Sequence, residues 1–299
     1  MTKFSSSELP RGLSQYRILD LPTRKGVNPS VRKIVAYWMD MVKQVYTPQQ
    51  ADWRIAEDCF VLCDETAEIL YGTGPWDEID YVPGSRPMLE WVLREKIKLN
   101  PKWTDLRKAL AIMRYSRDIC GQRRVGDIEL FYGGSEEDVI KKVATFCNEQ
   151  TRVMIRLAQI AGLPARYVGH ISGDHGTSEI KIDGQWAFFD IRGMYYYKSG
   201  RQVASIWDLR RDPSLIERQP ASADKDILSR TLGRTMTRTQ TFHKAITCIA
   251  PYRCGDYDWS SHLWTARTDE LTTKLKPLRE KWKLMLAEFH GGKDFSKPA

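Results

Sequence analysis

A two-residue turn, Asp183-Gly184, constrains the fold of this chain more than any other feature of its sequence. It stands between two short runs, residues 178–182 and 185–190. An Asp-Gly pair in this position is the strongest short-range signal for a β-hairpin, because a type I′ turn requires positive φ at both central residues. The sequence therefore predicts an antiparallel hairpin, and the length of the turn fixes which residues face each other.

The register of this hairpin brings a histidine close to a carboxylate. Thr177 is expected to face Asp190, and His175 lies two residues before Thr177. His175 therefore falls on the same face of the sheet as Asp190, as its diagonal neighbour. Diagonal neighbours are roughly 7–8 Å apart, within reach of an imidazole and a carboxylate that lean together. The spacing permits a His175–Asp190 pair.

The chain also places a cysteine, Cys147, at the start of a segment with helical periodicity. The apolar residues of this segment are Val153, Ile155, Leu157 and Ile160. Such spacing is typical of a helix with one buried face, and Gly162 and Pro164 are expected to end it. A thiolate nucleophile uses a sulfur to attack, an imidazole to take its proton and a carboxylate to orient the imidazole. Cys147, His175 and Asp190 are therefore the candidate catalytic residues.

These pieces together resemble the transglutaminase-like branch of the papain-like cysteine enzymes. The resemblance rests on Cys147 at a helix start, on the turn at residues 161–166 (Ala-Gly-Leu-Pro-Ala-Arg), and on the hairpin from His175 to Asp190. It implies an α+β fold with a papain/transglutaminase-like core, in which the nucleophile helix packs on an antiparallel sheet. It also implies that Cys147 is the nucleophile, His175 the general base and Asp190 the orienting acid.

The chain departs from the family pattern at three places. Phe146 stands where the family usually has a glycine before the cysteine, and Thr177 stands where an aromatic residue is usual. After Asp190 the chain continues with Ile-Arg-Gly at residues 191–193, where a Pro-Thr pair is common. These differences leave the three candidate residues intact and bear on substrate preference and on the backbone at the cysteine.

Each candidate residue also has a purely structural interpretation. A single buried cysteine is more often an inert small hydrophobe than a nucleophile, and a single histidine or aspartate at a strand end is commonly a loop or turn residue. The joint spacing of the three favours catalysis. Arg166 is expected to pair with a carboxylate beneath the helix–strand junction, while Glu179 and Trp186 are expected to support the hairpin.

The expected chemistry is acyl transfer or hydrolysis of an amide or ester bond through a thioester on Cys147. Water as acceptor makes the protein an amidase or peptidase, and an amine makes it a transferase. The backbone N–H of Cys147 is an expected oxyanion donor. Two alternatives within the resemblance are an N-glycan amidase-like deglycosylating activity and a non-catalytic transglutaminase-like binding module. A basic binding protein is a further alternative.

The chain before residue 130 is expected to be mainly helical. Helices are predicted after an N-cap at Ser30, over residues 49–70, from about Arg86, and after an N-cap at Thr104. A short strand or turn is expected at residues 127–132. The N-terminal region therefore covers residues 1–130.

Residues 131–212 form the expected catalytic core. Ser135 and Asp138 predict a capping box at a helix start. Periodicity alone favours one helix from there to Gly162, whereas the resemblance implies a break just before Cys147, which we favour. A strand, turn and strand are expected over residues 194–207, extending the sheet.

The tyrosines at positions 195–197 are expected to alternate into the core, with a groove-lining role for Tyr195 or Tyr197 as the alternative. Residues 213–299 are expected to be a basic extension that ends in an amphipathic helix over residues 269–289. Its apolar face is expected to comprise Leu271, Leu275, Leu278, Trp282, Leu284, Met285 and Phe289. All three regions are expected to form one compact unit.

The chain of 299 residues carries a net charge of +8. Its arginines are scattered and match no nucleic-acid motif, so an ordinary solvated surface is expected, with a groove for an anionic substrate as the alternative. The expected partner is a peptide, amide or glycan-linked substrate. No apolar run approaches the ~20 residues of a membrane span, and the first twenty residues show no signal peptide. We therefore expect a soluble cytoplasmic protein with reduced thiols and no cofactor or metal.

Overall fold

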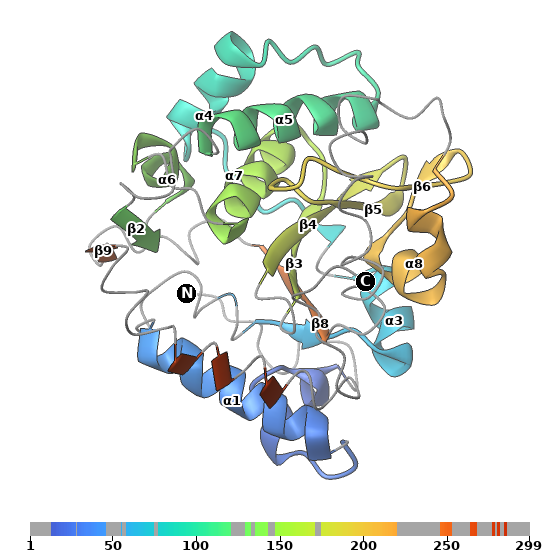
Figure 1. Ribbon diagram of the computed structural model, residues 1–299. Helices are drawn as coiled ribbons and strands as arrows, with labels where there is room; N and C mark the ends of the chain where they lie inside the picture. Colours follow the sequence, from blue (N-terminus) through green and yellow to red (C-terminus); the bar gives the residue numbers. More distant parts are fainter. Residues whose placement is uncertain are drawn as a thin grey trace.

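The computed structural model describes most of the chain between residues 13 and 219 and parts of the chain beyond it. The described residues are 13–27, 29–45, 55, 58–74, 77–120, 129–132, 135–142, 147–170, 175–219, 246–252, 264–267, 277–278, 280–281 and 284–285. Within them the fold combines α-helices with antiparallel sheet (Figure 1). The α+β class expected from the sequence is therefore confirmed.

A five-stranded antiparallel sheet organises the structure, in the order β1-β8-β3-β4-β5. Its strands are β1 Phe60–Val61, β8 Thr247–Pro251, β3 Ala165–His170, β4 His175–Ile182 and β5 Gln185–Phe189. Strand β8 comes from the last quarter of the chain and lies between β1 and β3, as its orange ribbon shows (Figure 1). The sequence analysis did not predict β1, β3 or β8 as strands.

The predicted hairpin is confirmed. Asp183 and Gly184 have φ values of 49° and 81°, as a type I′ turn requires. Ile182 pairs with Gln185, and the ladder continues to Ser178 and its partner Phe189. Strand β4 begins at His175, three residues earlier than the expected run, because it also pairs with the whole of β3.

Helix α7 (Cys147–Ile160) packs on β3 and β4 and on the neighbouring helix α5 (Asp105–Cys120). It ends before Gly162, whose φ of 82° only glycine adopts freely. The expectation of one buried face was too narrow, because every residue from 149 to 159 is buried. Other elements cover the polar face as well, and Thr151, Arg152 and Gln159 make hydrogen bonds there inside the protein.

The two faces of the sheet carry separate apolar clusters. The α7 face includes Ala165 and Ile180 and packs with α5, α7 and α1 (Pro29–Val45). The opposite face includes Val168 and Phe188 and packs with α3 (Asp64–Tyr71) and α8 (Ile206–Arg211). In Figure 1, α5 and α7 accordingly lie on the side of the sheet away from α3 and α8.

The expectations for the N-terminal helices are confirmed in part. Helix α1 begins at Pro29, so Ser30 lies inside it and is not its N-cap. Strand β1 and α3 occupy the second half of the helix expected over residues 49–70, because β1 pairs with β8. The remaining short elements of this half are η1 Ser14–Tyr16, η2 Leu21–Thr23, α4 Pro87–Trp91 and the π-helical turn η4 Val92–Lys96.

Two predicted helix starts are confirmed. The hydroxyl of Thr104 accepts the Arg107 N–H at 3.3 Å, at the start of α5. Ser135 and Asp138 cap α6 (Glu136–Lys142) reciprocally, since the Asp138 carboxylate accepts the Ser135 N–H at 3.0 Å.

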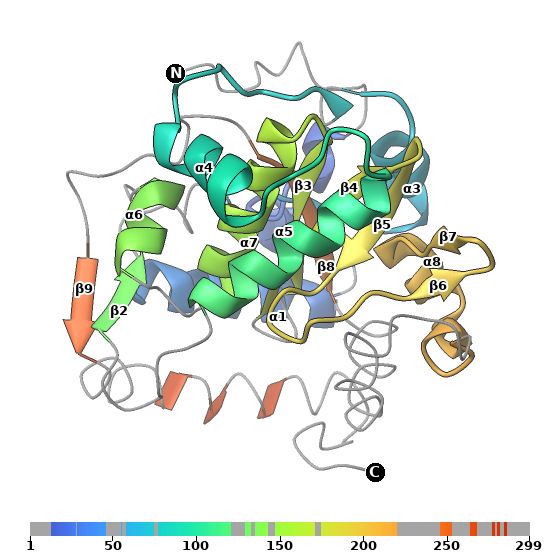
Figure 2. The ribbon, with the colours of Figure 1, turned by 90° about the horizontal axis from the view of Figure 1, so that it is seen from above.

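Figure 2 shows α6 and α7 as two separate helices, in contrast to the one helix that periodicity alone favoured. Residues 143–146, where the break was expected, lie outside the described residues.

The segment after Asp190 differs from its prediction. Strands β6 (Lys198–Ser199) and β7 (Gln202–Val203) pair with each other in a separate hairpin and do not join the five-stranded ladder. Trp207 lies in α8, because Ser205 and Asp208 form a capping box that starts a helix there. The 3₁₀ turn η6 (Pro213–Ile216) follows.

The described part of the C-terminal region contributes one more pairing and a few helical residues. Strand β9 (Trp264–Arg267) pairs with β2 (Glu129–Tyr132), which confirms the strand expected near residue 130. In the expected final helix, Met285 is buried but Leu284 is 67% exposed, so Leu284 does not belong to a buried face. Residues 269–276, 279, 282–283 and 286–289 of that helix, which include Leu271, Leu275, Trp282 and Phe289, lie outside the described residues.

No helix among the described residues is long and apolar enough to cross a membrane.

Candidate active site

The hairpin brings His175 and Asp190 into direct contact. His175 is the first residue of β4, and Asp190 follows the last residue of β5. The Nε2 atom of His175 lies 2.7 Å from Oδ2 of Asp190. The carboxylate side chain is 1% exposed, whereas the imidazole is 24% exposed. The pair is therefore anchored inside the protein at the carboxylate and faces solvent at the imidazole.

Cys147 meets this pair from the first turn of α7. Its sulfur accepts the backbone N–H of Gly176 at 3.4 Å and also hydrogen-bonds the side chain of His175. One turn further along α7, the Thr151 hydroxyl donates to the Gly176 carbonyl at 3.1 Å. The start of α7 is thus fixed to the start of β4 through both the N–H and the carbonyl of one residue, Gly176.

The electrostatics of the pair favour charge separation. Burial acts to lower the pKa of His175, but the Asp190 carboxylate and then the Cys147 sulfur outweigh burial and raise this pKa well above 6.5. Burial acts to raise the pKa of Asp190, but the His175 charge and hydrogen bonds hold it at about 2. At neutral pH the carboxylate is therefore ionised and the imidazole is protonated.

Gly193 and Tyr195, which follow Asp190 in the chain, both hydrogen-bond its carboxylate. The Gly193 N–H donates to Oδ1 at 2.8 Å, and a side-chain hydrogen bond from Tyr195 helps to lower the pKa of Asp190. The backbones of Asp190 and Tyr195 exchange two hydrogen bonds, at 3.0 and 3.1 Å. The sequence Ile-Arg-Gly after the aspartate therefore forms a tight turn that fixes the carboxylate.

The expectation that Arg166 pairs with a carboxylate is confirmed. Its Nε and Nη2 atoms both donate to Oε2 of Glu179, at 2.9 and 2.7 Å, and both side chains are fully buried. The other oxygen of Glu179 accepts from the Tyr71 hydroxyl and the Ile206 N–H. The guanidinium stacks 3.9 Å from the ring centre of Trp186. These residues join the hairpin to α3 and α8, in the supporting role expected for them.

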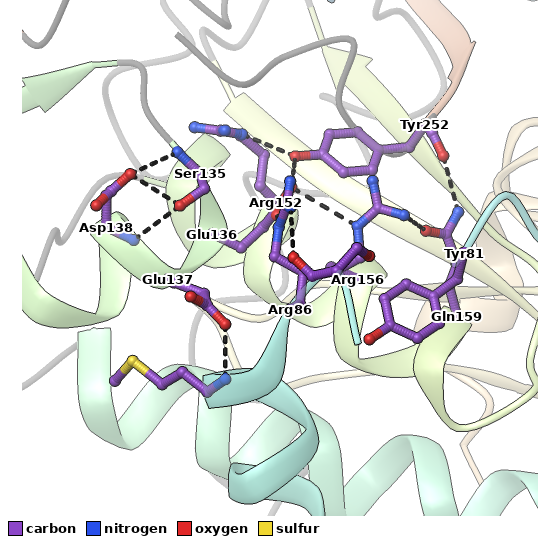
Figure 3. Close-up of polar contacts among 12 residues, drawn as sticks. Tyr81, Arg86, Ser135, Glu136, Glu137, Asp138, Arg152, Arg156, Gln159 and Tyr252 are labelled. Carbon is purple, nitrogen blue, oxygen red and sulfur yellow. Dashed lines mark hydrogen bonds and ion pairs between the residues drawn. The ribbon is translucent and has the colours of Figure 1, made fainter. Parts of the chain in front are cut away.

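A second buried polar cluster fixes the middle of α7 (Figure 3). Glu136 of α6 accepts from Arg86 at 2.9 Å and from the Tyr252 hydroxyl, and it lies 3.8 Å from Arg156. Arg152 donates to the same Tyr252 hydroxyl at 2.9 Å. The carboxylate thus joins α6, α7, the segment before α4 and the end of β8.

Gln159 completes this cluster. Its carbonyl oxygen accepts from Arg156 at 2.6 Å, and its amide donates to the Tyr252 carbonyl at 2.8 Å (Figure 3). The amide also donates to the Ala165 carbonyl at 3.2 Å. Polar residues of α7 therefore connect the helix to β3 and to Tyr252, which follows β8.

The structure brings together all three candidate residues predicted from the sequence. Sequence reasoning did not identify Gly176, Gly193 or His170, which surround them. It assigned Tyr195 to the core and left a groove-lining role open; Tyr195 is 4% exposed and contacts Asp190. Gly193 had a usable signal, because a glycine three residues after an aspartate favours a turn that returns its N–H to the carboxylate. The other contacts depend on cross-strand pairing.

The chain was compared with known proteins in three ways. No family model matches it, and no match was found among the curated proteins or among the solved structures.

Proposed function

We propose that this protein is a cysteine-dependent acyltransferase or hydrolase with a transglutaminase-like core, which cleaves an amide or ester bond through a thioester. The observation that supports this most directly is the unbroken contact from a buried carboxylate through an imidazole to a sulfur. It comprises the 2.7 Å Asp190–His175 contact and the His175–Cys147 hydrogen bond. This is the arrangement that activates a thiol.

The resting state in this proposal is an ion pair. The proton of the Cys147 thiol resides on His175, whose pKa is raised by Asp190 and Cys147 against the opposing effect of burial. Two further groups favour the thiolate. The Gly176 N–H donates to the sulfur, and Cys147 opens the 14-residue helix α7, where the backbone N–H groups carry partial positive charge.

Acylation begins when the thiolate attacks the carbonyl carbon of the substrate and a C–S bond forms. The oxygen becomes an oxyanion, for which the backbone N–H of Cys147 is a donor in the proposal. The tetrahedral intermediate collapses, the bond to the leaving amine or alcohol breaks, and His175 gives its proton to that group. The products of this half-reaction are a thioester on Cys147 and a neutral His175.

Deacylation reverses these roles. His175 takes a proton from an incoming water or amine, which attacks the thioester carbonyl and forms a new C–O or C–N bond. The C–S bond then breaks, and the Cys147 thiolate and the protonated His175 are regenerated. Asp190 remains ionised throughout and keeps Nε2 of His175 engaged, so that Nδ1 is the ring nitrogen left for proton transfer.

The proposed substrate is a peptide, an amide or a glycan-linked amide, and the net charge of +8 favours an anionic one. The alignment of the Asp190 carboxylate, the His175 imidazole and the Cys147 sulfur favours an enzyme over a binding module, because binding alone does not require it.

Acylation by a small activated ester tests the proposal. We expect 4-nitrophenyl acetate to add one acetyl group to Cys147, found by intact-protein and peptide mass spectrometry and removed by hydroxylamine as a thioester. His175→Ala should slow acetylation by about 10²–10⁴-fold, the usual contribution of a general base.

Cys147→Ser should abolish the label, and Cys63→Ser should leave it unchanged. Cys63 is the matched control because its side chain is also partly exposed but lies at the start of α3. Acetylation that is spread over several cysteines, or that His175→Ala does not slow, would contradict the proposed function.

A further inference from the structure

A second histidine lies directly against the proposed general base. His170 is the last residue of β3 and the cross-strand partner of His175. The two rings are stacked, with centroids 6.1 Å apart and planes inclined by 24°. His170 is 1% exposed, so its ring lies beside the His175 imidazole inside the protein, in an offset stack. The proposed reaction assigns no task to it.

The His170 ring is itself held in a defined orientation. Its Nε2 atom lies 2.9 Å from the Thr177 hydroxyl, and that hydroxyl lies 3.3 Å from the Val168 carbonyl. The edge contact with Phe188 has a centroid distance of 6.2 Å and an angle of 74°. The ring is therefore fixed by a polar contact and by an aromatic contact.

His170 differs from its neighbour in charge. Burial, the positive charge of His175 and, less strongly, Arg210 lower the pKa of His170 to about 3, against an opposing effect of Asp190. His170 is therefore neutral at neutral pH, where the pKa of His175 favours its protonated form. A neutral aromatic ring against an imidazolium is attractive, whereas a second imidazolium would repel it.

We propose that His170 is a positioning residue, whose anchored neutral ring holds the His175 imidazole in line between Asp190 and Cys147. His170 restricts the movement of the His175 ring and, being neutral, does not repel its positive charge. The stacked ring prevents rotation of His175 away from the carboxylate and occupies space in which water would compete for the ring. This inference rests on the proposed function, because it concerns the same imidazole.

The test uses iodoacetamide alkylation of Cys147 as a function of pH, in the full chain and in variants of His170. His170→Ala removes the stacked ring, so we expect the midpoint of the profile to rise by about one pH unit, which is about a tenfold slower reaction at pH 6. His170→Phe keeps a ring, and we expect its rate at pH 6 to stay within about threefold of the wild-type rate, a change below about 0.7 kcal/mol.

A pair of matched threonine variants tests the anchor. Thr177→Val removes the hydroxyl that contacts His170. Thr247→Val is its control, because Thr247 faces His170 from the other neighbouring strand, is also fully buried, and has a hydroxyl without a hydrogen-bond partner among the described residues. We expect Thr177→Val to shift the midpoint upward and Thr247→Val to leave it in place.

The outcomes separate this inference from the proposed function. An ordinary thiol profile in the wild-type chain, unchanged by His175→Ala, would overturn the proposed function. A low-pH profile in the wild-type chain that His170→Ala leaves unchanged would overturn only the role of His170, as would equal losses in His170→Ala and His170→Phe. Should neither His170 variant fold, Thr177→Val decides, and a profile identical to that of Thr247→Val overturns the inference.

Discussion

Asp190 controls the charge of the candidate site at the scale of single residues. It is buried, it accepts hydrogen bonds from His175, Gly193 and Tyr195, and these hold its pKa at about 2, so it is ionised at neutral pH. Its negative charge is the leading reason why the pKa of His175 is raised against burial. The protonated imidazole in turn stabilises a thiolate at Cys147.

Asp190→Asn should therefore weaken the nucleophile without removing it. With the charge of residue 190 removed, the largest effect that raises the pKa of His175 is lost, so this pKa falls and less of the imidazole is protonated at neutral pH. We expect alkylation of Cys147 at pH 6 to slow by at least about tenfold, the effect of one pKa unit. Asp183→Asn, in the turn of the same hairpin, is the control, because asparagine tolerates its positive φ. Equal rates in all three proteins would contradict the assigned role of Asp190.

Gly176 should resist substitution for a steric reason. A Cβ atom at this position would lie 2.2 Å from the hydroxyl oxygen of Tyr167 and 2.9 Å from Cζ of the same ring. We expect Gly176→Ala to lower the free energy of unfolding by about 1–3 kcal/mol, as overpacking does. Adding Tyr167→Phe removes the nearer atom and should restore part of the loss. Urea unfolding of the two single variants and the double variant measures this, and strict additivity would contradict the clash.

At this scale the sequence predicted the contact of His175 with Asp190, because a turn of known type places both on one face of a hairpin. Cys147 was selected by its place at a helix start and by the family resemblance. It was insufficient for His170 and Tyr195. The position of His170 depends on the pairing of β3 with β4, which requires that β3 be recognised as a strand. Tyr195 contacts Asp190 because residues 190–195 form a turn, whereas the sequence analysis predicted a strand from residue 194 onward.

At the scale of elements, α7 is the part of the fold whose position matters most. Its first turn carries Cys147, and its middle carries Arg152 and Arg156, which contact Glu136 and Tyr252 (Figure 3). Burial acts to raise the pKa of Glu136, but the three neighbouring arginines and the Tyr252 hydroxyl hold it at about 2. The carboxylate is therefore ionised and joins α6 to α7.

Glu136→Gln should destabilise the fold strongly, because it leaves buried guanidinium groups without their carboxylate. We expect a loss of about 3–5 kcal/mol at pH 7, typical of a broken buried ion pair. Glu95→Gln is the control, since its side chain is 49% exposed beside Arg94 and should change stability by less than about 0.5 kcal/mol. Denaturant unfolding curves measure both, and equal small losses would contradict the role of the cluster.

The same variant has an expected pH dependence. A carboxyl group whose pKa is lowered on folding stabilises the folded state at pH values above its unfolded pKa, and this contribution is lost as pH falls towards the folded pKa. For Glu136 the fall runs from 4.5 to about 2. The difference in unfolding free energy between wild type and Glu136→Gln should therefore be constant above about pH 5 and shrink below it. A difference that grows on acidification would contradict this assignment.

Helical periodicity was reliable for the longer helices, although Ser30 is not the N-cap of α1, and periodicity failed for short strands. Thr104 and Ser135 marked true helix starts, and α7 has the expected periodicity. Strand β1 has only two residues, too few to show a periodicity of two. The sequence analysis therefore included it in the helix predicted over residues 49–70. Its strand conformation comes from pairing with β8, a contact across almost two hundred residues that no local window contains.

At the scale of the whole molecule, the C-terminal region completes the sheet. The sequence analysis described residues 213–299 as an extension, yet β8 lies between β1 and β3 and contributes Cys248 and Ile249 to the apolar clusters on its two faces. Leu278 and Met285 contact the cluster on the α7 face, which also includes residues from the N-terminal region and the core. One hydrophobic cluster thus draws on all three expected regions.

A chain that ends at residue 219 should therefore lose its cooperative fold. Without β8, strands β1 and β3 have no partner on that side and two apolar clusters are opened. We expect the shortened chain to show no cooperative thermal transition by circular dichroism and tryptophan fluorescence, while the full chain shows one. A shortened chain that unfolds with the same midpoint as the full chain would contradict this role of β8 and the expectation of one compact unit.

The pH dependence of iodoacetamide alkylation at Cys147, measured in the wild-type chain and in His175→Ala, tests the central claim most directly. An ion-paired nucleophile predicts rapid alkylation that persists well below the ~8.5 of a free thiol and that the variant loses. Slow alkylation that follows an ordinary thiol in both proteins would contradict the claim, because the sulfur, imidazole and carboxylate would then lie close together without activating the cysteine.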